Sequence, residues 1–128
     1  MKNLILLLSI VCFGVNAQTF VSTTPENKKV VLEEFTGIYC GFCPDGHVIG
    51  QGLHTANPND VFLINIHTGG YAGPNGPSDP DFRTIFGNAI ANASGLAGYP
   101  AGTVNRATFN TIAPQGSAGS TALSRGDW

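Results

Sequence analysis

Apolar residues form two short, nearly continuous runs in the first half of the chain, and these runs predict two buried strands. The first, residues 28–36, lacks the strict alternation of a half-exposed strand, so it is expected to be covered on both faces. The second, residues 61–66, is apolar enough to occupy the centre of a parallel sheet. Between them a helix is expected over residues 40–56, because Pro44 suits a first helical turn and residues 57–60 form a stop signal.

The second half of the chain is expected to contain a loop at residues 68–80, a second helix and a third strand. The helix is expected to start at residues 79–81, with the sequence Asp-Pro-Asp, and to end at Gly95. Six apolar residues recur at helical spacing: Phe82, Ile85, Phe86, Ala89, Ile90 and Ala93. Phe82 and Phe86 are expected in the core. A turn at residues 98–102 precedes a strand at residues 103–105. This order of elements predicts an α/β fold with parallel strands and right-handed crossovers.

The N-terminus has the pattern of a secretory signal peptide. Lys2 precedes an apolar run over residues 4–15, and cleavage is expected after Ala17. The run is too short to span a membrane, so no transmembrane helix is expected once it is removed. Cys12 lies inside this segment and would be removed with it. The predicted domains are therefore a signal peptide, residues 1–17, and one domain, residues 18–128.

Composition narrows the function classes further. The formal net charge is −2 and only 11% of the residues are charged, so no basic patch for nucleic acid is present. Gly (17) and Pro (8) are abundant and fall mostly after residue 69, which indicates a loop-rich C-terminal half. No cofactor is predicted.

The pair Cys40 and Cys43 is the main candidate for chemistry. A disulfide that closes so small a loop removes little entropy from the unfolded chain, so a redox role explains it better than a structural one. At a helix N-terminus Cys40 is expected to be the attacking thiol, with a pKa below the usual value of about 8.5. Cys43, one turn further, would attack the mixed disulfide and release the partner. Gly41 is expected to allow a tight turn between them.

An acidic residue and a proline add to this site. Glu34 lies on the first predicted strand; if buried, its pKa would be raised and it could exchange a proton with Cys43. The alternatives are that Glu33 points inward instead, or that neither is buried. The Tyr99-Pro100 bond would suit a cis peptide in a tight turn, where the Tyr99 backbone could pair with an extended substrate, but an ordinary trans turn is the alternative.

Histidines offer weaker candidates. His67 ends the second strand, either as a proton donor near the cysteines or, as we favour, as a structural residue bonded to the Gly69-Gly70 loop. A zinc site formed by His47 and His67 with the two cysteines is disfavoured, because there is no second close ligand pair. We therefore predict no metal.

Four segments in this order resemble a known family: residues 31–46 around the cysteines, then residues 64–74, 79–84 and 98–106. The order of elements resembles the thioredoxin fold, and the segments resemble the outer membrane protein 28 family of Gram-negative bacteria. The thioredoxin resemblance implies a three-layer α/β fold, a buried acid at Glu34 and a cis-proline at Pro100. Substrate-binding residues are then expected at Tyr39, Tyr99 and Pro100.

The chain departs from the thioredoxin pattern in two respects. Tyr39 replaces the usual tryptophan before the first cysteine, and the last strand and helix are hard to find, so the domain is expected to lack them. The resemblance implies a protein of the periplasm or outer membrane, with outer-membrane association. Its expected function is thiol–disulfide exchange with cysteine-containing exported proteins, with Cys40, Cys43 and Glu34 as catalytic residues. The alternative is a non-catalytic surface or binding protein on the same scaffold, which the glycine-rich C-terminal half favours.

Overall fold

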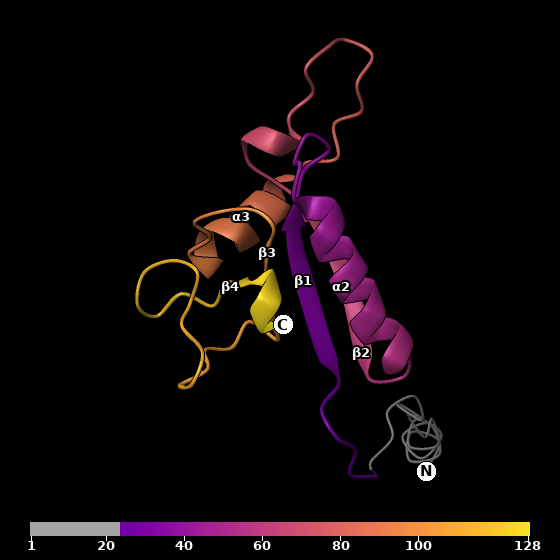
Figure 1. Cartoon of the computed structure of the whole chain (residues 1–128), viewed down its shortest axis with the longest axis vertical. Coiled ribbons are helices and arrows are strands. Elements are labelled where there is room, and N and C mark those ends of the chain that lie inside the picture. The colour runs from indigo at the N-terminus through magenta and orange to yellow at the C-terminus, as the bar shows by residue number, and fades with distance from the viewer. Residues whose placement is uncertain (1–23) are drawn as a thin grey trace, which may run out of the picture.

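A computed structural model describes residues 24–128, which form a mixed α/β fold with a four-stranded sheet and two α-helices (Figure 1). The predicted signal peptide and Cys12 lie outside the described residues. The elements, in chain order, are β1 (Val30–Thr36), α2 (Cys43–Ala56), β2 (Val61–His67), the 3₁₀ turn η1 (Gly70–Ala72), α3 (Ile85–Ser94), β3 (Ala101–Val104), β4 (Leu123–Ser124) and the 3₁₀ turn η2 (Arg125–Asp127).

The sheet has the order β2-β1-β3-β4 and is not parallel throughout. β1 and β2 pair in parallel, from Val30 opposite Val61 to Thr36 opposite His67. β3 runs antiparallel to β1, and β4 antiparallel to β3, so the predicted parallel direction of the third strand is wrong. The apolar pattern of a strand does not encode its direction, which depends on where the chain leaves the preceding helix.

The two α-helices cover opposite faces of the sheet. On the α2 side, a side chain at Gly50 would meet Leu63 and Leu32, so the helix backbone approaches these leucines closely. On the α3 side, a buried cluster joins Phe35, Ile66, Ala91 and Ala101. Figure 1 shows α2 and α3 on either side of β1, in agreement with the expected three layers.

β2 is an edge strand of the described sheet, although its sequence predicts a central one. Phe62 and Ile64 are exposed on one face of it, and no further strand of residues 24–128 pairs with its outer edge. A continuous apolar run therefore identified the strand correctly and its place in the sheet incorrectly.

α3 begins at Ile85, several residues later than predicted. The Thr84 side chain caps it by accepting a hydrogen bond from the Gly87 amide at 2.9 Å. Asp79 and Asp81, where the helix was expected to start, make other contacts: Asp79 accepts from the backbone amides of residues 75 and 76, and Asp81 pairs with Arg83. Phe82 precedes the helix, and both Phe82 and Phe86 are exposed, so their predicted place in the core is wrong.

The C-terminal segment folds back onto the sheet and adds β4, a two-residue strand that the sequence did not predict. The Ser120 hydroxyl donates to the Ser94 carbonyl at 2.6 Å, which ties this segment to the end of α3. Ala122 and Leu123 are buried there. β4 thus forms the edge of the described sheet opposite β2.

Within residues 24–128, no helix has the length and apolar character needed to cross a bilayer.

An ion pair between a buried glutamate and a largely exposed arginine stabilises the α3 side of the sheet. The Glu33 carboxylate, on β1, accepts from the Thr103 hydroxyl at 3.0 Å and from Arg106 Nε at 2.7 Å, and it also binds Arg106 Nη2. The hydrogen bond from Arg106 is the largest cause that holds the pKa of Glu33 below its ordinary value of 4.5, against the opposing effect of burial. Glu33 is therefore ionised in the folded protein.

Arg106→Gln should lower the free energy of unfolding by about 1–2 kcal/mol at neutral pH, because it leaves a buried carboxylate with fewer donors. Since the folded pKa of Glu33 is depressed, this contribution is complete above pH 4.5 and is lost as the pH falls through the folded pKa. Urea unfolding of both proteins at several pH values measures it. Arg83→Gln, which breaks an exposed pair, should change stability by less than about 0.5 kcal/mol. A gap between Arg106→Gln and wild type that stays constant into acid would contradict this assignment.

Candidate active site

Cys40 and Cys43 form a disulfide at the start of α2, with an S–S distance of 2.08 Å. α2 begins at Cys43 rather than at Cys40, so the predicted start of this helix is three residues early. Cys40 lies in the turn that leads into the helix, and its carbonyl accepts from the Cys43 amide at 3.2 Å. The disulfide therefore spans the N-terminus of α2, where free N–H groups and the helix dipole favour negative charge.

The two cysteines differ in access to solvent. Cys40 is 7% exposed and Cys43 is 1% exposed, whereas Phe42 between them is 69% exposed. A side chain at Gly41 would meet nothing within 4 Å, and its φ is not positive, so the expected need for glycine in this turn is wrong. The outer sulfur of the pair belongs to Cys40.

The turn before Cys40 is held by the loop that follows β2, and both lie beyond the same end of β1 (Figure 1). The Tyr39 amide donates to the Tyr71 carbonyl at 2.9 Å, and the Tyr39 hydroxyl binds the Asp79 carboxylate. Gly37 packs directly against the Tyr71 backbone. Tyr39, a predicted substrate-binding residue, is thus an exposed aromatic residue directly before Cys40. The loop after β2 fixes the position of Tyr39.

Glu34 is the buried acid on the α2 side of the sheet. Its side chain is fully buried, and Oε2 lies 2.9 Å from His47 Nδ1 on α2. Burial is the largest effect and raises the pKa of Glu34 above its ordinary value, while the hydrogen bond and charge of His47 act in the opposite direction. Glu34 therefore has a stronger tendency to hold a proton than an exposed glutamate.

The other oxygen of Glu34, Oε1, is buried and has no hydrogen-bond partner. It lies beside Gly46, where an added Cβ would be 2.7 Å from Oε1 and 3.0 Å from Pro100 Cβ. Gly46 follows Cys43 by one helical turn, so the carboxyl and Pro100 both lie against the first turns of α2. An unpartnered buried carboxyl oxygen is costly, and such groups are often functional.

The alternatives that the sequence left open for Glu33 and Glu34 are resolved by strand alternation. Both side chains are buried, on opposite faces of β1. Glu33 points to the α3 side, where Arg106 satisfies it, and Glu34 points to the α2 side, where only one of its oxygens is bonded. Their environments push the two pKa values in opposite directions.

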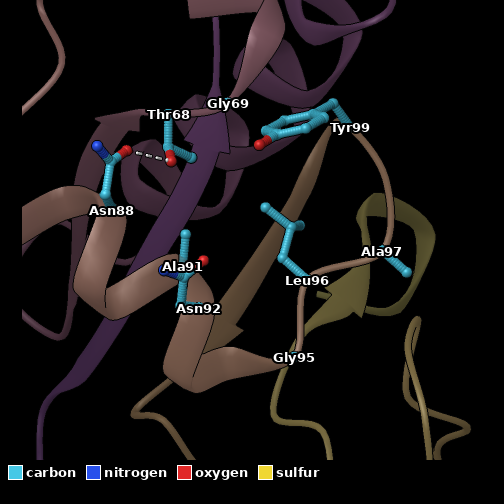
Figure 2. Close-up of a pocket in the computed structure, with 9 residues that line it drawn as sticks. All are labelled: Thr68, Gly69, Asn88, Ala91, Asn92, Gly95, Leu96, Ala97 and Tyr99. Carbon is cyan, nitrogen blue, oxygen red and sulfur yellow. Dashed lines mark hydrogen bonds between the residues drawn. The ribbon is translucent and has the colours of Figure 1, made fainter.

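The Tyr99-Pro100 peptide bond is cis, which confirms that prediction. Tyr99 lines an open pocket of about 510 Å³ between α3 and the start of the cis-proline turn, and its hydroxyl points toward Gly69 (Figure 2). Next to Gly69, the Thr68 hydroxyl donates to Asn88 Oδ1 at 2.7 Å. Neither cysteine is among the residues that line this pocket.

His67 lies at the end of β2 with its ring 5.1 Å from that of Phe82. Its Nδ1 is buried without a hydrogen-bond partner, and burial, followed by the charge of His47, lowers its pKa. This contact with Phe82 was not predicted. Across residues 24–128, no three His, Cys, Asp or Glu side chains come together as a metal site.

Arg125, from η2, reaches the candidate site from the C-terminal part of the chain. Its guanidinium lies 6.0 Å from the Phe42 ring centroid and pairs with Asp45 in the first turn of α2. Neither Arg125 nor His47 was predicted at this site, because both join it through tertiary contacts. The spacing of His47, four residues after Cys43 on one helix, is the only local signal that could have indicated it.

Comparison with known proteins finds no family model, no curated protein and no solved structure that matches this chain.

Proposed function

We propose that this protein exchanges dithiols and disulfides with other proteins through Cys40 and Cys43. The observation that carries the proposal is the disulfide across the N-terminus of α2, with Cys40 as the more exposed sulfur. A helix N-terminus stabilises a thiolate at this position. The guanidinium of Arg125 lies close to Phe42 and is paired with Asp45 in the first turn of α2. Glu34 supplies a buried carboxyl beside the same helix.

The reaction has two exchange steps. In the dithiol form, the Cys40 thiolate attacks a sulfur of a partner disulfide, forms a mixed disulfide and releases the first partner thiolate. The Cys43 thiol then loses its proton to Glu34, and its thiolate attacks the Cys40 sulfur. This step re-forms the Cys40–Cys43 disulfide and releases the second partner thiolate. Two electrons pass from the protein to the partner, and the two partner thiolates take protons from solvent; oxidation of a partner is the reverse.

We further propose a thioredoxin-like scaffold of the outer membrane protein 28 type, exported to the periplasm or outer membrane of a Gram-negative bacterium. The support is the sequence resemblance, the N-terminal signal pattern and the order of elements: a strand, the cysteine pair, a helix, a strand, a helix, a cis-proline and antiparallel strands. Disulfides persist in that compartment. Cysteine-containing exported proteins are the proposed partners, and Tyr39, Tyr99 and Pro100 are proposed to contact them.

The purified protein, checked for folding by circular dichroism, should catalyse the reduction of insulin by dithiothreitol well above the rate of dithiothreitol alone. The matched control is the double variant Cys40→Ser/Cys43→Ser, which keeps the scaffold and should show only the background rate. A folded wild-type protein no faster than this control would overturn the proposed chemistry and support the alternative of a binding protein on the same scaffold.

A further inference from the structure

We propose that His47 is a positioning residue for the resolving step, one that holds Glu34 and carries a proton between this buried carboxyl and solvent. The proposal rests on the proposed dithiol–disulfide exchange and deepens it. From the sequence alone, His47 was considered only as a ligand in a disfavoured zinc site. The proposal also accounts for the unpartnered oxygen of Glu34.

His47 connects the buried acid to the surface. The Glu34 side chain is 0% exposed and that of His47 is 40% exposed, and the two are joined by the 2.9 Å contact between Oε2 and Nδ1. The other ring nitrogen, Nε2, lies 3.3 Å from the Thr36 hydroxyl. Both ring nitrogens therefore face β1, while part of the ring reaches water. Glu34 has no comparable route of its own.

The same helix brings the histidine to the resolving cysteine. Cys43 and His47 are four residues apart in α2 and lie on one face of it. Gly46, between them, leaves the space that Glu34 Oε1 occupies. In the disulfide form Cys43 has no proton to give, so Oε1 has no donor there. Reduction creates an S–H group on the neighbouring turn, and Oε1 is free to accept its proton.

The charged and titratable groups around His47 are few. Cys43 faces it from its own helix, Glu34 from β1 and His67 from β2, and His47 is near enough to lower the pKa of His67. Two other carboxylates are already paired elsewhere, Glu33 with Arg106 on the opposite face of the sheet and Asp45 with Arg125 at the helix N-terminus. Glu34 is thus the carboxylate available to His47.

The proton balance of the step follows from this pairing. In the proposed step the Glu34–His47 pair takes one proton from Cys43 and passes one proton to water. Cys43 gives its proton to Oε1, and His47 releases a proton to water while its Nδ1–H still donates to Oε2. One proton enters the pair and one leaves it, so its net charge does not change. Cys43 thus becomes a thiolate while the net charge of the Glu34–His47 pair stays the same. Additional charge on this pair would be costly in a low-dielectric site.

The resolving step can be observed directly with an aromatic disulfide. One equivalent of 5,5′-dithiobis(2-nitrobenzoate) reacts with the reduced protein and releases one thionitrobenzoate as Cys40 forms the mixed disulfide. Attack by Cys43 then releases the second, and its rate is followed from about pH 5 to about pH 8. His47→Gln should slow the second release about tenfold, less than the loss of a direct acid or base, and should remove an inflection from its pH profile.

The matched control is His54→Gln, on the same helix, where the ring bonds only the Val61 carbonyl at 2.7 Å. It should keep the wild-type profile. In a second variant, His47→Ala, added imidazole should restore much of the rate, which a purely structural role would not allow. Identical profiles for His47→Gln, His54→Gln and wild type, or no rescue of His47→Ala, would overturn the role of His47 and leave exchange intact. Absence of a second release from wild type would instead overturn the proposed function itself.

Discussion

A Cys43→Ala variant should stop turning over and should accumulate mixed disulfides on Cys40. The variant keeps the more exposed sulfur, which can still attack a partner disulfide, but it lacks the buried thiol that resolves the adduct. Its insulin reduction should therefore fall to the rate of dithiothreitol alone. Mass spectrometry of the variant after incubation with envelope extracts should find partner proteins attached through Cys40, and a reductant should release them.

The reverse variant, Cys40→Ala, is the control for this trap. Its remaining sulfur, on Cys43, is only 1% exposed, so it should form few or no adducts under the same conditions. The contrast tests which cysteine attacks. If Cys40→Ala captures partners as readily as Cys43→Ala, the roles of the two cysteines are reversed.

Secondary structure near the cysteines could be predicted well, because local signals there agree with the tertiary contacts. β1 and β2 were located to within a few residues from apolar runs, and the end of α2 was predicted at Ala56, where the structure has it. Helix starts were predicted wrongly where a residue typical of a helix start makes a different tertiary contact. Asp79 was expected to start a helix, but its carboxylate binds Tyr39 and two backbone amides of the preceding loop.

The position of an element in the sheet could not be predicted from its own residues. Residues 61–66 are apolar, but β2 lies at the edge because that depends on which other segments pair with it. Residues 103–105 were expected in a parallel strand, whereas β3 covers Ala101–Val104 and is antiparallel. β4 was missed because a two-residue strand has no periodicity to detect.

The candidate site was predictable only in part, for the same reason. The cysteine pair is visible as a motif, and the cis bond before Pro100 and a buried Glu34 came from the family resemblance. The partner of Glu34, His47, depends on how α2 is rotated over β1. Arg125 depends on the return of the C-terminal segment, more than 70 residues after the motif. These contacts set the electrostatics of the site.

Gly37→Ala should be the most damaging single substitution beside the site, with a loss of about 3 kcal/mol in the free energy of unfolding. A Cβ at Gly37 would lie 2.4 Å from the Tyr71 carbonyl carbon and 2.6 Å from the Ala72 amide nitrogen. These are backbone atoms, which cannot move aside as a flexible side chain can. The change should also displace the Tyr71 carbonyl from the Tyr39 amide. Urea unfolding with circular dichroism measures the loss.

The control for this prediction is Gly41→Ala, between the cysteines, where an added Cβ meets nothing within 4 Å. It should change stability by less than about 0.5 kcal/mol. Both substitutions reduce the backbone flexibility of the unfolded chain to the same extent. The difference between the unfolding free energies of the two variants therefore measures the effect of the contact with Tyr71. Equal stability of the two would mean that the loop does not rest on Gly37 in solution. Tyr39 and Cys40 would then lose the support that this contact provides, and the orientation of the attacking sulfur would depend on α2 alone.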